Sequence, residues 1–162
     1  FQAHCDIAGA FGNYKISVHS GSDKFKIFPI VGEKTGMRFH LKTAGTSWLE
    51  SLRVIALEEP ELYRAIHKQA LASYDDARKL YHVTKDVSLV PDVSTIPDKE
   101  LSTLLEMDEA RQLLHITYGG ILKCLSLAEL FFNAMNRHEN RYYEILCKHF
   151  MKHLESLGVP KN

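Results

Sequence analysis

The sequence contains little cysteine. Cys5, Cys124 and Cys147 are the only three in 162 residues, and none has CxxC spacing. An odd and widely spaced set argues against a disulfide framework and favours free thiols in a reducing compartment. We therefore expect a cytoplasmic protein.

Long apolar runs and excess charge are also missing. No run approaches the ~18 apolar residues that a membrane helix needs, and 20 Lys+Arg balance 20 Asp+Glu. A net charge of zero gives no basis for binding nucleic acid or an anionic membrane, and we expect neither partner. The P-loop, GxGxxG, GxSxG and HExxH motifs are absent as well, which removes the usual support for nucleotide-dependent and serine-hydrolase functions.

What the chain does contain is typical of one globular domain. Hydrophobic residues make up 45% and charged residues 25% of its 162 residues, and this length suits a single domain. The chain opens at Phe1, without an initiator Met, in what reads as the end of a helix. We therefore expect a piece of a longer protein.

The first third of the chain alternates between strands and helices. Period-two patterns predict strands over 14–19 and 37–42, with a short helical segment over 24–31 between them. Ser47 and Glu50 have the spacing of a capping box, which predicts that the next helix begins at Ser47. This order of elements is typical of a parallel sheet.

From about residue 58 the pattern becomes helical. One helix is predicted from Pro60 toward Lys79, and a second from Asp108 to a break at Gly119-Gly120. The last helix is predicted over 126–157, because no breaker interrupts it before Gly158.

The two predicted strands end in similar chemistry. His19 closes the first strand and precedes Ser20-Gly21-Ser22-Asp23-Lys24, and Lys42 closes the second and precedes Thr43-Ala44-Gly45-Thr46-Ser47. Strand ends of a parallel sheet, Gly/Ser loops and helix N-termini are sites where α/β proteins bind anionic groups. The alternatives are a packed histidine and a solvated lysine in turn-forming loops.

Charge is uneven along the chain. Residues 1–48 carry six Lys and Arg against three Asp and Glu. This excess is consistent with a small anion near the strands, although an imbalance of three charges also arises by chance.

Other histidines carry weaker signals. His149 and His153 are one helical turn apart, but no third ligand is evident, and we interpret them as surface or packing residues rather than a metal pair. Arg111, His115 and Tyr118 form a polar cluster in an apolar stretch, and could be packing residues or contribute to a lid or site.

The motifs over residues 15–25 and 40–50, together with Leu114–Gly119, closely resemble the tagaturonate epimerase family. The resemblance implies a metal-dependent enzyme that interconverts the sugar acids tagaturonate and fructuronate at C4. Family members are considerably longer, so the resemblance implies a C-terminal fragment. Its implied fold is α/β: residues 1–57 would form two strands of a (β/α)8 TIM-like barrel, and residues 58–162 a largely helical extension, all within one domain.

The resemblance also implies roles for site residues. A His before a Gly/Ser loop binds metal in the similar class II aldolases, so His19 would be a ligand of a divalent zinc, nickel or manganese ion. Lys42 would be the catalytic residue and would hold the uronate carboxylate. The substrate-binding candidates are Ser20, Gly21, Ser22, Asp23, Lys24, Thr43, Gly45, Thr46 and His115. The other metal ligands would lie in sequence that is absent here.

The chemistry favours one route. C4 is not adjacent to the C2 ketone, so its hydrogen is not acidic enough for simple deprotonation. Retro-aldol cleavage of C3–C4 and re-addition remains, since transient oxidation would need a nicotinamide fingerprint that this sequence lacks. The alternatives are a class II aldolase-like sugar lyase and a non-catalytic helical interaction module.

The strand pair has consequences for association. Two strands leave unpaired edges, and we expect an apolar barrel-facing side. We therefore predict that the isolated chain is inactive, and that it self-associates or contacts the missing N-terminal part.

Overall fold

The computed structural model describes residues 1–12, 14–19, 25–43 and 45–159, and the chain divides into two compact units. The strand unit comprises Phe1–Thr46 and Leu146–Asn162, and the helical unit comprises Ser47–Ile145. The sequence pattern changes near residue 58, whereas the units divide after Thr46 and again inside the last helix.

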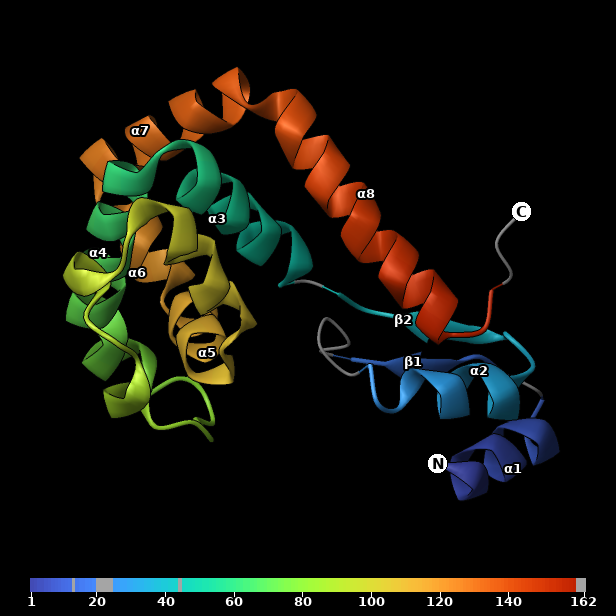
Figure 1. The fold of residues 1–162 in the computed structure, drawn as a ribbon. Coiled ribbons are helices and arrows are strands. Elements are labelled where there is room, and N and C mark those ends of the chain that lie inside the picture. Colours follow the sequence, from blue (N-terminus) through green and yellow to red (C-terminus); the bar gives the residue numbers. More distant parts are fainter. Residues whose placement is uncertain (13, 20–24, 44, 160–162) are drawn as a thin grey trace. The chain divides into compact units, whose positions relative to one another are not determined.

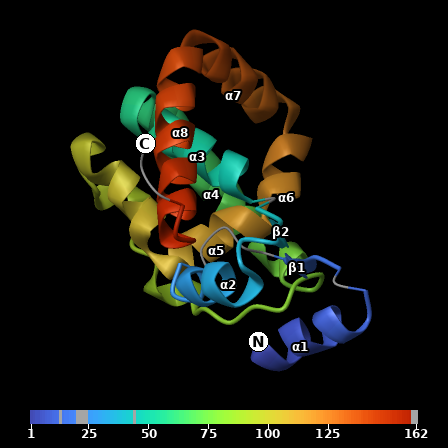
Figure 2. The same cartoon turned by 90° about the vertical axis from the view of Figure 1, so that its right-hand side faces the viewer.

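The strand unit contains the predicted parallel pair. In chain order it holds α1 (Gln2–Ala10), β1 (Ile16–Val18), α2 (Phe28–Thr35) and β2 (Phe39–Leu41), and α2 lies alongside the strands in both views (Figures 1 and 2). The strands run parallel, with Ile16 opposite Phe39 and Val18 opposite Leu41. The prediction of two parallel strands is confirmed.

Both strands and α2 are shifted from their predicted bounds. The strand predicted from Met37 begins only at Phe39, because Gly36 and Met37 have φ values of 55° and 65° and so cannot be extended. Helix α2 begins at Phe28 rather than at residue 24, with Pro29 in its first turn, where a missing N–H costs nothing.

One face of the strand pair is buried by helices. Val18, Phe28, Val31 and Leu157 form the core of the strand unit, and Phe39 and Leu41 pack against it. Leu157 follows α8 (Glu139–Ser156), so α2 and the end of α8 cover the same face.

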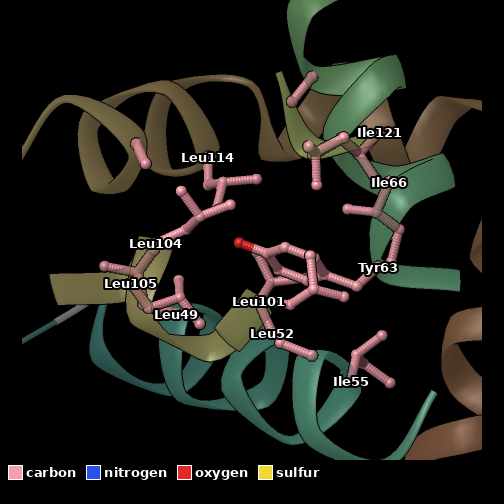
Figure 3. Packing of buried hydrophobic residues seen from close by; sticks show 14 of the residues in the cluster. Leu49, Leu52, Ile55, Tyr63, Ile66, Leu101, Leu104, Leu105, Leu114 and Ile121 are labelled. Carbon is pink, nitrogen blue, oxygen red and sulfur yellow. The ribbon is translucent and has the colours of Figure 1, made fainter. Parts of the chain in front are cut away.

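The helical unit is built from short and medium helices around one core. After α3 (Thr46–Glu58) come α4 (Pro60–Ala77), the 3₁₀ segments η2 (Val87–Leu89), η3 (Val93–Thr95) and η4 (Asp98–Glu106), then α5 (Asp108–Ile116), α6 (Tyr118–Lys123) and α7 (Leu125–Arg137). The core side chains come from α3, α4, η4, α5 and α6, and the ring of Tyr63 lies in their midst (Figure 3). None of the described helices is both long and apolar enough to cross a membrane.

The predicted start of α3 is wrong by one residue. The Thr46 N–H donates to the Thr43 carbonyl oxygen at 3.0 Å, and this turn starts the helix at Thr46. Ser47 is therefore an exposed residue inside the helix, so the proposed capping box does not form. Glu50 instead binds Arg53, with 2.9 Å between Oε2 and Nε.

Two predicted features of the later helices are also wrong. Gly119-Gly120 does not break a helix but lies inside α6, where a Cβ on Gly120 would be 2.6 Å from the Ser73 Cβ of α4. Glycine there permits close helix packing. The predicted helix over 126–157 is interrupted at His138, where the Glu59 carboxylate binds both Arg137 and His138.

Candidate functional site

The exposed face of the strand pair carries polar side chains. Ser17 lies opposite His40 in the strand register, with 2.8 Å between Ser17 Oγ and His40 Nδ1. Successive side chains alternate between the faces of a strand, so His19 and Lys42, each two residues further on, belong to the same face. All four are exposed. We call these four residues the polar face.

His19 and Lys42 meet at the carboxyl ends of the strands. Beyond the last paired residues, the Lys42 N–H donates to the Val18 carbonyl oxygen at 2.9 Å. Continued by one residue, the register sets His19 opposite Lys42, about 4.8 Å apart along the hydrogen-bonding direction. This edge is where open α/β sheets bind ligands. The extended register therefore places the positions of these two predicted site residues next to each other, and their roles stay predictions.

The chain after Lys42 forms a turn into α3. Thr43 is half-buried, whereas Gly45 and Thr46 are buried. The Thr46 hydroxyl has no hydrogen-bond partner among the described residues, although it lies at a helix N-terminus. Free N–H groups and the helix dipole favour an anion at such a position. The predicted site residues Ser20, Gly21, Ser22, Asp23 and Lys24 lie outside the described residues.

The other predicted cluster belongs to the helical unit. His115 is exposed on α5, and its predicted role in substrate binding stays a prediction. Arg111 donates from Nη1 to the Leu105 carbonyl oxygen at 2.8 Å, which gives it a structural role. Tyr118 lies 6.5 Å from the Trp48 ring and lines a cavity of about 420 Å³ together with Tyr81 and Lys123.

The two histidines of α8 are packing residues, one of the two roles that the sequence suggested. The His153 ring lies 4.7 Å from Phe25 and 5.3 Å from Phe28, and its Nδ1 donates to the His149 carbonyl oxygen at 2.9 Å. Across the described part of the chain, no three His, Cys, Asp or Glu side chains are placed to hold a metal ion. The role of His19 as a metal ligand stays a prediction.

Sequence reasoning missed two members of the polar face. Ser17 and His40 lie inside the predicted strands, but the sequence pattern alone indicates no role for either. Period-two alternation could have found them, because Ser17 precedes His19 by two residues and His40 precedes Lys42 by two. The ladder that pairs Ser17 with His40 depends on register, which the sequence of two short strands does not specify.

Solved carbohydrate epimerases share this fold. Two crystal structures of the fructuronate-tagaturonate epimerase UxaE from Cohnella laeviribosi, with one and with two glycerol molecules, match with TM-scores of 0.93 and 0.94 at 43% and 42% identity. The matches cover 97% and 98% of this chain and 33% and 34% of those chains.

Sequence comparison assigns the family. The UxaE tagaturonate epimerase family matches residues 1–157, and the chain belongs to this family of isomerases acting on carbohydrates. The tagaturonate/fructuronate epimerase of Thermotoga maritima is 45% identical over 154 residues, which are 95% of this chain and 32% of that protein. The chain therefore spans about a third of the length of these relatives.

Proposed function

We propose that this chain contributes the polar face to an enzyme that interconverts tagaturonate and fructuronate at C4. The proposal is supported by the parallel pairing of two strands whose carboxyl ends are followed by His19 and Lys42, in a chain that belongs to the tagaturonate epimerase family. The chain spans about a third of its relatives' length. The proposal therefore concerns an epimerase that is as long as those relatives, contains this sequence and acts in the cytoplasm.

Lys42 and the start of α3 suit the carboxylate of a sugar acid. The Lys42 ammonium group is exposed at the strand end, and the buried Thr46 hydroxyl lies four residues further on, at the helix N-terminus. A charge-assisted hydrogen bond from Lys42 is stronger than a neutral one and fixes the substrate's orientation. Thr43, Gly45 and Ser22 are proposed to complete this anion site.

The proposed reaction is a retro-aldol cleavage followed by aldol re-addition. The C4 hydroxyl loses its proton to a base, the C3–C4 bond breaks, and C4 becomes an aldehyde. The bond electrons pass to C3 and the C2 carbonyl as an enolate. Re-addition of C3 to the other aldehyde face and return of the proton give the C4 epimer, without net oxidation.

A divalent ion, zinc, nickel or manganese, is proposed as the cofactor. The residues described here supply His19 but no set of three ligands, so they do not complete a metal site by themselves. The other ligands would come from outside the described residues. We further propose that β1 and β2 belong to a (β/α)8-type barrel, whose active-site end is the carboxyl end of its strands.

The test is turnover of the full-length epimerase that contains this sequence. Tagaturonate is incubated with the wild type and with the His19→Ala variant, fructuronate is quantified by NMR, and bound metal by elemental analysis. We expect interconversion by the wild type, and a loss of rate and of metal in the variant. His82→Ala is the matched control, because His82 is an exposed histidine of the helical unit. No interconversion by the wild type would reject the function, and full activity with full metal in His19→Ala would reject the ligand role.

A further inference from the structure

His40 has the contacts of an oriented functional histidine. It lies on the polar face, exposed, two residues before Lys42 on the same strand. Its Nδ1 is 2.8 Å from Ser17 Oγ, directly across the ladder. A cross-strand hydrogen bond of this length holds the imidazole in one orientation, with Nε2 on the side away from Ser17.

The strand register places His40 beside the other site residues. Extended one residue beyond the last printed pair, Val18 and Leu41, the register places His19 and Lys42 next to Ser17 and His40 in the carboxyl direction, and the alternation of side chains puts them on the same face. Alternate residues of a strand are about 6.7 Å apart, so a sugar acid held by Lys42 would extend within reach of the His40 ring. The retro-aldol reaction needs a base at the C4 hydroxyl.

We propose that His40 is this base, and that Ser17 is a positioning residue that sets its ring; the inference rests on the proposed function. The Nδ1–H of His40 donates to Ser17 Oγ, which leaves the Nε2 lone pair for the C4 hydroxyl. Nε2 takes the hydroxyl proton as C3–C4 breaks, and the electron pair goes to the enolate at C3–C2. After re-addition, Nε2–H returns the proton to the C4 alkoxide, so the histidine is unchanged over one turnover.

Chemical rescue tests the role of the ring. His40→Ala in the full-length epimerase is expected to lower kcat at least 100-fold with a change in KM below threefold. Added imidazole is expected to raise the kcat of His40→Ala at least tenfold, because it can occupy the space of the missing side chain. His82→Ala, with and without imidazole, is the control and should keep the wild-type kcat. Metal content and circular dichroism are measured for every variant.

A second variant separates the base from its support. His40→Asn retains an N–H that can donate to Ser17 Oγ but has no Nε2, and it should lose kcat as His40→Ala does, which also covers a failure of His40→Ala to fold. Ser17→Ala should lower kcat about tenfold, since it leaves the base present but unoriented.

Three results would overturn the proposal. The first is wild-type kcat in His40→Asn. The second is a loss in His40→Ala that imidazole does not restore and that follows a loss of bound metal, which would make His40 a ligand. The third is a loss that follows only the folded fraction, which would make His40 structural. A wild type without epimerase activity rejects the proposed function instead.

Discussion

His67 is a buried titratable residue in the helical unit. It is fully buried on α4 and lies 6.0 Å from the Tyr63 ring, and neither of its ring nitrogens has a hydrogen-bond partner among the described residues. Burial lowers the pKa of His67 from its ordinary 6.5 to about 4, with Asp92 acting weakly in the opposite direction. The side chain is therefore neutral in the folded protein at pH 7, and protonation would place an unpaired charge in the core.

This shift predicts an acid-sensitive helical unit. Between pH 6.5 and about 4 the unfolded chain binds a proton at His67 that the folded chain does not, so stability falls as pH falls through this window. The full contribution is about 3 kcal/mol, from roughly 1.4 kcal/mol per pKa unit. Denaturant unfolding at pH 7.5 and 4.5 measures the free energy of unfolding at each pH. The difference between the two values should be smaller in His67→Leu than in the wild type. His82→Gln is the control, and an unchanged difference in His67→Leu would contradict the assignment.

The site residues differ in whether the local sequence around each of them predicts a role in the site. His19 and Lys42 were predictable because each follows a β-branched or aromatic alternating segment and precedes a Gly-containing loop. The hydrogen bond between Ser17 and His40 was not, because it depends on pairing between strands 23 residues apart in sequence. Sequence reasoning found the ends of the strands and missed the face between them.

Gly32 determines how α8 packs on α2. A Cβ at Gly32 would lie 1.9 Å from the carbonyl oxygen of Leu157, and backbone atoms cannot move aside as a side-chain end can. We predict that Gly32→Ala destabilises the strand unit by at least about 2 kcal/mol, in the range of an overpacked core. Gly9→Ala is the control, because nothing lies within 4 Å of its Cβ position and alanine favours the helix. Thermal unfolding is measured for Gly32→Ala and Gly9→Ala. Equal stability of the two variants would contradict the close approach of the Leu157 carbonyl oxygen to Gly32.

The break between α7 and α8 shows why helix ends were harder to predict than helices. No Gly or Pro occurs from Leu125 to Leu157, so sequence periodicity gives one continuous helix. The break at His138 is made by a tertiary contact instead: Glu59, at the start of α4, accepts hydrogen bonds from Arg137 at 2.6 Å and from His138 at 3.0 Å. The hydrogen bond from Arg137, which has the larger effect, and the hydrogen bond from His138 hold the pKa of Glu59 below its usual range. Such a contact has no local signature.

The isolated chain of 162 residues is expected to associate and to lack turnover. In its described part the sheet has two strands, whose outer edges carry unpaired backbone groups. Large apolar side chains are also exposed, among them Phe11 at 78%, Leu80 at 83% and Leu125 at 82%. Sedimentation at micromolar concentration should show species larger than a monomer. A compact monomer that epimerises tagaturonate would contradict this prediction.

The binding of substrate at the polar face is tested most directly by the rate of tagaturonate conversion after Lys42→Ala in the full-length epimerase that contains this sequence. If the polar face holds the substrate, removing the ammonium group should lower kcat/KM about 100-fold, near 3 kcal/mol, the upper value of a hydrogen bond to a charged group. Lys148→Ala provides the matched control, because Lys148 is an exposed lysine of the same unit. We expect a loss of kcat/KM in the first variant and wild-type kcat/KM in the second. Equal and undiminished rates in both, at the same folded fraction, would show that the strand edge does not bind the substrate.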